Sequence, residues 1–372
     1  MIKSKLLILL LAINITVFSQ IDNLTEQFVL PSTLEENSGI IFYNNKLITH
    51  NDSGGQTYLY ELDITTNQIT RTISIANATN TDWEDITQDD NYIYIGDFGN
   101  NHGTRTDLKI YKIAKSDYLT NDTVTASIIN FSYEDQTDFS DNSETNFDAE
   151  AMIVYNNNIH IFTKNRGDFK TKQYVIPNNT GTHSATLLST YNVEGLITGA
   201  GLNLANNVLL IGYTYYLKPF IIVLDDMNAD ATFNNFIKTD LFPEIGYNQT
   251  EGICLVSDNH FFLSSEKFVY NSTTIDQKLF TFDYTQNVDH IKDNVKFNFS
   301  LYPNPVKEEL LINNIPLNSV FYMYNSNGLL VYSKKVKSTS FNWQRPENIG
   351  NGIYFIKVVS TKDSIAKKII LQ

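Results

Sequence analysis

Short segments that run from polar to apolar residues recur along the chain. Each opens with polar or acidic residues, continues through one or two small residues and ends in an apolar run; the segments are 36–40, 82–86, 148–152, 197–201 and 250–254. A short turn and a second apolar strand follow each one. No long stretch repeats apolar positions at i, i+3, i+4 and i+7, so we predict strands and almost no helix.

The spacing of these segments predicts a β-propeller. Marker positions separated by 48, 66, 49 and 52 residues are Glu36, Glu84, Glu150, Gly199 and Glu251. Each interval holds about four short strands, which is typical of propeller blades. We therefore expect an all-β protein with a β-propeller of five blades. The longest interval contains a polar insertion at 135–146, which we expect to be a loop; a divergent sixth blade there is the alternative.

One strand is left over at the start of the body and one is lacking at its end. Residues 24–30 alternate before the first repeat, whereas the fifth repeat has no fourth strand after residues 278–284. Pairing of these two stretches would complete the fifth blade and close the ring. Closure also removes an exposed sheet edge.

The first residues have the pattern of a signal peptide. Lys3 and Lys5 precede an apolar stretch from Leu6 to Val17, and a cleavage site precedes Gln20, so we assign 1–19 to export. The apolar stretch is too short to cross about 30 Å of hydrocarbon, so we expect no transmembrane segment. The propeller is then assigned to 20–284 and a linker to 285–298.

Charge changes sign along the chain. Residues 20–298 hold 16 Lys/Arg and 37 Asp/Glu, whereas residues 299–372 hold 9 and 4. The acidic body argues against binding of nucleic acid through its phosphates and suits cation binding. The 22 Tyr and 23 Phe favour strands. The single cysteine, Cys254, excludes an intrachain disulfide.

Residues 299–372 contain alternating strands separated by turns and are expected to form a small β-sandwich. Four stretches resemble the C-terminal sorting domain of the type IX secretion system of Bacteroidetes: Tyr302-Pro303-Asn304-Pro305, Asn327-Gly328, Gly352-Ile353-Tyr354 and Lys367-Lys368. The resemblance implies that the type IX machinery is a partner and that the protein is secreted or attached to the outer-membrane surface. An ordinary adhesion module is the alternative.

A propeller brings two sets of residues to one face of the disc. The start of each first strand and the end of each second strand meet there. The strand starts are Glu36, Ser38, Asp82, Glu84, Asp85, Asp148, Glu150 and Glu251. The strand ends are His50-Asn51-Asp52-Ser53, Asp97, Asn100, Asn101, Lys164, Arg166, Tyr213, Glu266 and Lys267.

Three of these acids predict a cation site. Glu84, Glu150 and Glu251 are expected to converge at the channel mouth, where repulsion would raise their pKa values. A hard cation relieves that repulsion, and ligands that are all oxygen suit Ca²⁺. The lack of clustered His or Cys argues against Zn²⁺. The alternative is that these acids cap turns or face water.

At the same residues the body resembles the five-bladed propeller of calcium-activated nucleotidases, which holds a central calcium through one Ser or Glu of each blade. The matching positions are Ser38 in ENSGI, Glu84 in WEDI, Glu150 in DAEAM and Glu251 in TEGI. The fourth blade has Thr198-Gly199-Ala200 instead, so a backbone carbonyl at Gly199 or a water would substitute. The nucleotide-handling segments of that family have no counterpart in this sequence. The motifs HNDSGG, DWEDI and GDFGNN also look like motifs of exported bacterial propellers.

Catalysis at this rim remains open from sequence. His50 or Asp97 could act as a general base, and Arg105 or Arg166 could bind an anionic ester beside a metal. Ion pairs that tie loops together are the alternative. Three functions follow: an exported propeller with a structural Ca²⁺ and an unknown ligand or small-molecule substrate at its acidic rim, a Ca²⁺-dependent hydrolase of phosphate or carboxylate esters, or an adhesin without metal.

Overall fold

The computed structural model describes residues 18–225, 235–287, 299–317, 319–326, 329–346, 348–360 and 364–372. Most of the predicted signal peptide, most of the predicted linker and the Asn327-Gly328 turn lie outside these ranges. The chain divides into two compact units, residues 17–287 and residues 288–372 together with 1–16. We describe each unit by itself.

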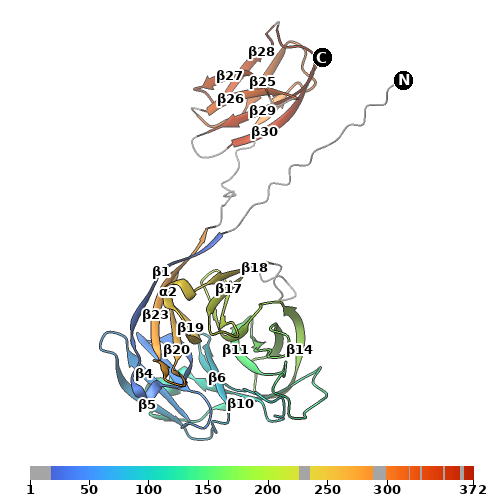
Figure 1. Ribbon diagram of the computed structural model, residues 1–372. Helices are drawn as coiled ribbons and strands as arrows, with labels where there is room; N and C mark the ends of the chain where they lie inside the picture. Colours follow the sequence, from blue (N-terminus) through green and yellow to red (C-terminus); the bar gives the residue numbers. More distant parts are fainter. Residues whose placement is uncertain are drawn as a thin grey trace. The chain divides into compact units, whose positions relative to one another are not determined.

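The first unit is built from five four-stranded antiparallel blades (Figure 1). Blade 1 consists of β2 (Asn37–Tyr43), β3 (Lys46–Asn51), β4 (Tyr58–Asp63) and β5 (Gln68–Ile75). Blade 2 consists of β6 (Trp83–Gln88), β7 (Tyr92–Asp97), β8 (Lys109–Ala114) and β10 (Ser127–Tyr133). Blade 3 consists of β11 (Ala149–Tyr155), β12 (Asn158–Thr163), β13 (Thr171–Pro177) and β14 (Gly181–Tyr191). Blade 4 consists of β15 (Leu196–Leu202), β16 (Val208–Tyr213), β17 (Pro219–Asp225) and β18 (Asn235–Asp240). Blade 5 consists of β19 (Gln249–Ser257), β20 (His260–Glu266), β23 (Lys278–Asn287) and β1 (Phe18–Val29).

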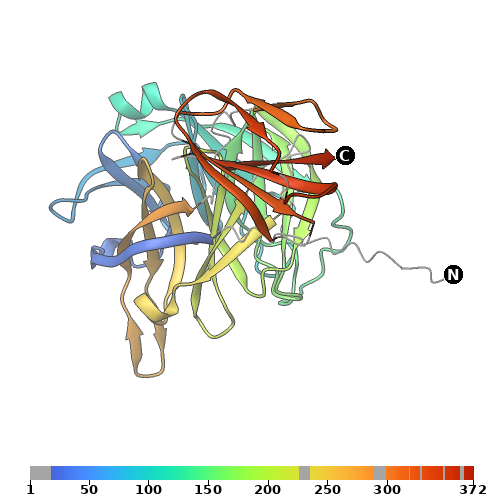
Figure 2. The same cartoon turned by 90° about the horizontal axis from the view of Figure 1, so that it is seen from above.

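The blades form a closed ring. The first strands contact one another in the order β2, β6, β11, β15, β19 and back to β2. The ring closes because β1 pairs antiparallel with β23, from Phe18 opposite Asn287 to Val29 opposite Lys278. Figures 1 and 2 both show the blue β1 beside the orange β23. The predicted five-bladed propeller, closed by the strand that precedes the first repeat, is confirmed.

Additional pairings join neighbouring blades at the circumference. Strand β10 pairs in parallel with β14, and β9 (Thr123–Val124) pairs in parallel with β5. The insertion 135–146 contains no strand, as predicted, and rests on the loop after β7: the Gln136 side chain donates to the Gly103 carbonyl at 2.8 Å. The other small elements of the described body are η1 (Ser32–Leu34), α1 (Lys115–Thr120), α2 (Phe242–Ile245), β21 (Phe268–Tyr270) and β22 (Thr273–Ile275).

Each boundary between neighbouring blades holds its own buried apolar cluster. Between blades 1 and 2, for example, Trp83 is fully buried with Ile41, Ile73 and Tyr111. These clusters arise because both faces of every blade are covered, so the strands carry apolar residues in short runs rather than on alternate positions only. Packing between the blades therefore fixes how the first strands surround the axis.

The second unit is a small β-sandwich. One sheet contains β24 (Ser300–Tyr302), β25 (Glu309–Asn313) and β28 (Ser340–Gln344); the other contains β27 (Leu330–Val336), β26 (Ser319–Asn325), β29 (Gly352–Val359) and β30 (Ser364–Leu371). Phe321, Met323 and Trp343 are buried between the two sheets with Ile356 and Ile369. This arrangement confirms the all-β prediction for residues 299–372.

Candidate functional site

A β-bulge interrupts every first strand near its start. The pairing register shifts at Glu150 in β11, at Thr198 in β15 and at Glu251 in β19. In β2 and β6 the shifts span Ser38-Gly39 and Glu84-Asp85. Bulges change the direction in which a side chain points, and they are frequent next to functional sites. The five bulges lie at one level of the ring and bear the polar side chains.

The bulges and the ends of the second strands enclose a small polar cavity of about 50 Å³. Its lining residues are Ser38, Asp52, Glu84, Asn101, Glu150, Lys164, Glu251 and Glu266. All eight belong to the two residue sets that the propeller geometry predicts on one face. The structure thus brings together four of the predicted metal ligands, Ser38, Glu84, Glu150 and Glu251.

The position of the fourth-blade residue differs from the prediction. The bulge in β15 places Thr198, not Gly199, at the level of Glu150 and Glu251. The Thr198 hydroxyl donates to the Thr250 carbonyl of blade 5. Gly199 does not line the cavity, and a Cβ added there would lie 2.6 Å from the Glu251 carbonyl oxygen. Gly199 is therefore a site of close strand approach, and the residue spacing alone was one position out of register.

Acidic side chains outnumber basic ones in the cavity. Five of the lining residues are Asp or Glu, whereas Lys164 supplies the single positive charge among them. The Lys164 Nζ lies 3.1 Å from Glu150 Oε1. Within the described chain, no N–H or hydroxyl donor reaches the buried Glu150 Oε2 and Glu251 Oε2, although a hydrogen bond between the Glu84 and Glu150 carboxyl groups favours the charged form of Glu150. Two carboxylate oxygens therefore remain available at the centre of the cluster.

Burial and close approach raise the pKa values of the glutamates in the cavity. Burial, reinforced by Asp52 and Glu150, raises the pKa of Glu84 well above its ordinary value. Burial raises the pKa of Glu150 to about 8 and that of Glu266 to about 8, although Lys164 favours the charged form of both. Burial likewise raises the pKa of Glu251 well above its usual range. The cluster holds protons at neutral pH unless a cation replaces them.

Two groups of carboxylates are close enough to share one cation. Ligand atoms of Asp52, Asp82 and Glu84 lie within 4.8 Å of one another, and so do those of Glu84, Asp148 and Glu150. Asp148 is already paired with Arg166 and accepts the Asn100 N–H, so it is less available. Glu84 is common to both groups. Oxygen donors without His or Cys fit Ca²⁺ rather than Zn²⁺.

Ser38 and Thr198 have corresponding roles in blades 1 and 4. The Ser38 hydroxyl donates to the Glu84 carbonyl of the next blade, just as Thr198 donates to the Thr250 carbonyl. Donation uses the hydroxyl hydrogen, so the Ser38 oxygen keeps its lone pairs. Ser38 can therefore both tie β2 to β6 and offer an oxygen to a cation in the cavity.

Below the cavity the channel is constricted around Asp85. This buried carboxylate accepts the N–H groups of Met152 at 2.7 Å and Ile86 at 2.8 Å, and also that of Ala200. A Cβ on Gly39 would lie 2.5 Å from the Ile86 nitrogen, so only glycine lets β2 approach β6 there. Asp85 thus lies across the axis and joins three first strands, whereas the residue pattern predicts it on the rim beside Glu84.

Replacing Asp85 tests this structural role. In Asp85→Asn the amide keeps one acceptor oxygen but turns an N–H₂ group toward backbone donors. We expect a loss of about 1–3 kcal/mol in the free energy of unfolding, the usual cost of an unpaired buried polar group. Urea titration followed by circular dichroism measures it. Asp90→Asn, at an exposed position in the turn after β6, is the control and should change stability little.

The proposed catalytic residues are mostly held in structural contacts. Arg105 pairs with the fully buried Asp97 at 2.9 Å and donates to the Gly99 carbonyl at 2.8 Å, which fixes the loop after β7. His50 is buried against Trp83, and burial lowers its pKa to about 4. None of these three candidates lines the cavity. Arg166 comes nearest, 3.9 Å from Glu150 Oε1, while paired with Asp148.

Comparison with known proteins identifies the second unit. Residues 300–372 match the family of secretion system C-terminal sorting domains. No curated protein sequence matches the chain.

Several solved structures are similar to the chain. It is 14% identical to PorZ, a surface component of the type IX secretion system of Porphyromonas gingivalis, with a TM-score of 0.36 over 90% of this chain and 45% of PorZ. The chain therefore spans less than half the length of PorZ. An exo-β-1,3-galactanase from Phanerochaete chrysosporium is 9% identical to this chain, with a TM-score of 0.45; the alignment covers 95% of this chain and 100% of the galactanase chain. An α-L-arabinofuranosidase from Clostridium thermocellum is 12% identical over 71% and 96% of the two chains, with a TM-score of 0.34.

The propeller assignment rests on the strand topology rather than on these similarities. None of the helices in the described ranges is long and apolar enough to cross a membrane. The match over 300–372 includes Tyr302 to Pro305 and Lys367-Lys368, the residues whose resemblance indicated a sorting domain. The chain carries a C-terminal sorting domain of the type IX secretion system, and it is a secreted or cell-surface protein with a β-propeller body.

Proposed function

We propose that the mouth of the propeller channel binds one Ca²⁺, which stabilises the ring, and that the acidic rim around it binds the ligand of this exported protein. The observation that carries the proposal is the pair of buried oxygens, Glu150 Oε2 and Glu251 Oε2, that no N–H or hydroxyl donor of the described chain reaches. Buried carboxylates are normally paired or bound to metal, because an uncompensated buried charge is costly.

The charge balance supports a divalent cation. The cavity contains Asp52, Glu84, Glu150, Glu251 and Glu266 against Lys164. Even with Arg166 3.9 Å from Glu150, the acids outnumber the basic groups. A divalent ion between the glutamates would neutralise two of them, and it would use the oxygens that no hydrogen bond occupies. The affinity of such a site rises with the number of ligand charges.

Glu251→Gln tests the site directly. The change keeps the shape of the side chain and removes its charge, so we expect the Ca²⁺ affinity to fall by about tenfold or more while the propeller still folds. Titration calorimetry of the mature chain, stripped of metal with a chelator, measures the affinity. Glu244→Gln, at an exposed position of α2, is the matched control and should bind as the unchanged protein does.

Two results would contradict the calcium proposal. One is a stripped protein that takes up no Ca²⁺, which would favour a propeller without metal, as in a structural adhesin. The other is a Glu251→Gln variant that binds Ca²⁺ as tightly as the control, because the ion would then lie elsewhere. In the calcium-bound protein, added chelator should lower the melting temperature, since an ion that binds only the folded state stabilises it.

The geometry gives less support to a hydrolase. His50, with its lowered pKa and buried ring, does not reach the cavity, and Arg105 is fully engaged in holding its loop. Of the proposed catalytic residues, Arg166 comes nearest to the cavity, and its guanidinium is already paired with Asp148. The sorting domain remains the partner of the type IX machinery in either case.

A further inference from the structure

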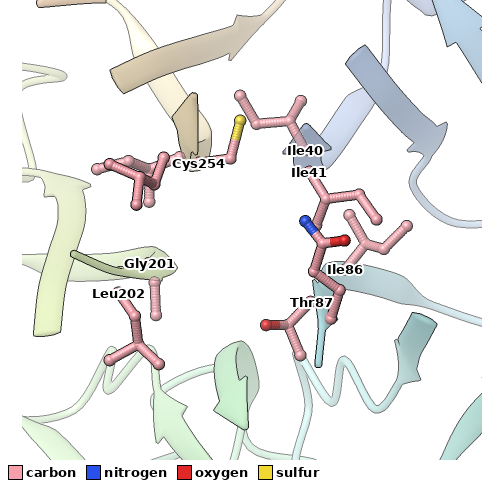
Figure 3. A pocket seen from close by; sticks show the side chains of 11 residues that line it. Ile40, Ile41, Ile86, Thr87, Gly201, Leu202 and Cys254 are labelled. Atoms are coloured by element: carbon pink, nitrogen blue, oxygen red, sulfur yellow. The ribbon is translucent and has the colours of Figure 1, made fainter. Parts of the chain in front are cut away.

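The end of the channel beyond Asp85 contains a second, larger cavity. It has a volume of about 220 Å³ and lies between first strands of four blades. Figure 3 shows side chains of these strands, among them Ile40, Ile86, Leu202 and Cys254, around one open space. Neither the calcium proposal nor the sorting domain uses this cavity.

The constriction separates the two cavities. Glu84 lines the upper cavity, Asp85 lies in the constriction and Ile86 lines the lower cavity, so consecutive residues of β6 pass through three layers. In β19 the same order is Glu251, Gly252 and Ile253. A Cβ on Gly252 would lie 2.9 Å from the Ile40 nitrogen, so the strands are in close contact at this level. The lower cavity is therefore a separate compartment.

The chemistry of the lower cavity is opposite to that of the upper one. The described residues that line it include no Asp, Glu, Lys, Arg or His. Thr87 and Gln88 supply the polar side chains, and the Gln88 Nε2 is already committed to the Phe42 carbonyl at 2.9 Å. Ile40 and Ile253 are buried at the inner end, whereas Leu202 and Leu255 are partly exposed and mark the outer end. The wall also offers polar surface, including the buried Gln88 Oε1, which accepts no hydrogen bond within the described chain.

We propose that this lower cavity is a binding site for a small, neutral, mainly apolar molecule about the size of a one- or two-ring aromatic compound. The size follows from the volume: an apolar cavity of about 150 Å³ holds one benzene molecule. The neutrality follows from the absence of any charged partner in the wall, because a charged ligand would lose its hydration without compensation. The proposal does not depend on calcium binding at the other end of the channel.

Cys254 is a built-in reporter of occupancy. It is the single cysteine of the chain and lies in the cavity wall. Burial raises the pKa of its thiol well above the ordinary value, so the thiol is inert at neutral pH and reacts slowly under alkaline conditions. A molecule in the cavity should shield it from a small neutral reagent such as iodoacetamide.

The test uses the mature full-length chain with indole and toluene as neutral probes and indole-3-acetate and benzylammonium as their charged counterparts. We expect the neutral probes to bind about tenfold more tightly than the charged ones, because only the latter pay for losing a charge's hydration. Titration calorimetry measures binding, and mass spectrometry measures whether saturating indole slows the alkylation of Cys254.

Two variants on opposite walls locate the site. Leu202→Trp and Thr87→Phe fill the cavity and should each weaken indole binding by about tenfold or more, because the ligand volume is taken. Leu204→Trp is the control: Leu204 is 69% exposed, follows the same strand and does not line the cavity. Ca²⁺ affinity should be unchanged in all three, so failure of this proposal is distinguishable from failure of the calcium proposal. Indole binding that is absent, or equally strong in Leu202→Trp and Thr87→Phe, would overturn it.

Discussion

Without divalent cations, the propeller becomes less stable as the pH rises from about 5 to about 9. This direction is opposite to that of most proteins, whose buried carboxylates have lowered pKa values. Here burial raises the pKa values of Glu150 and Glu266 to about 8 and that of Asp52 to about 7. The folded protein therefore holds protons that the unfolded chain releases above its ordinary carboxyl pKa. Stability present at low pH is lost as these groups ionise.

The expected effect is large. One pKa unit corresponds to about 1.4 kcal/mol. Since the pKa of Glu150 is raised from 4.5 to about 8, we expect the interacting carboxyl groups together to lower the free energy of unfolding by on the order of a few kcal/mol across this range. Urea unfolding at several pH values, with chelator present, measures the change. Trp343 lies in the sorting domain, so a Trp343→Phe background leaves Trp83 as the fluorescent reporter of the propeller.

Calcium provides the control within the same experiment. A bound cation replaces the protons on the glutamates, so saturating Ca²⁺ should remove most of the loss at high pH. If the free energy of unfolding measured with chelator stays constant or increases from pH 5 to pH 9, the cluster is fully ionised in the folded state. The proposed repulsion between the carboxylates would then be wrong.

Lys164→Met should have two opposite effects, a less stable apo protein and a tighter calcium site. The Lys164 side chain is 9% exposed and pairs with a Glu150 side chain that is 2% exposed. At about pH 9, where Glu150 is ionised, loss of one partner of this buried ion pair costs about 3–5 kcal/mol. The same loss removes a positive charge that opposes a cation in the cavity, so the Ca²⁺ affinity should rise by about tenfold or more. Thermal unfolding with chelator and calcium titration measure the two effects.

Lys170→Met is the matched control on the same blade. Its side chain is 43% exposed and lies 3.5 Å from Asp168, so its removal should cost less than about 1 kcal/mol and leave calcium affinity unchanged. A Lys164→Met protein that binds calcium more weakly would show that the ammonium group positions the glutamates rather than competing with the ion. The sign of the change in affinity thus distinguishes the two roles of Lys164.

Much of the site was predictable because a propeller repeats. Once the polar-to-apolar segments are aligned, Ser38, Glu84, Glu150 and Glu251 must lie at one level of the channel, and the ends of the second strands must lie beside them. The error at blade 4 has a physical cause. Each first strand contains a bulge, and the bulge in β15 falls on Thr198, one residue before Gly199. Residue spacing does not show where a strand accommodates an extra residue.

The roles of single charged groups could not be predicted in the same way. Asp97 and Arg105 have the residue types of a catalytic pair, yet they pair with each other beneath a loop. Lys164 has the residue type of a rim cation, yet it lies inside the acidic cavity. Asp85 is adjacent to Glu84 in sequence, but the bulge directs its carboxylate to the backbone of two other blades.

The all-β class, the repeat of four strands and the closing strand could be predicted from the alternation and order of apolar residues, which are local properties of the chain. The sorting domain was indicated by the resemblance of short motifs such as Tyr302-Pro303-Asn304-Pro305 to a known family. Which polar groups face each other, and which stay unpaired, depends on the folded ring, because side-chain direction is set by the bulges and by packing between blades. The folded ring also divides the channel into an acidic and an apolar cavity, since that division requires Asp85 and the glycines of different blades to meet on one axis.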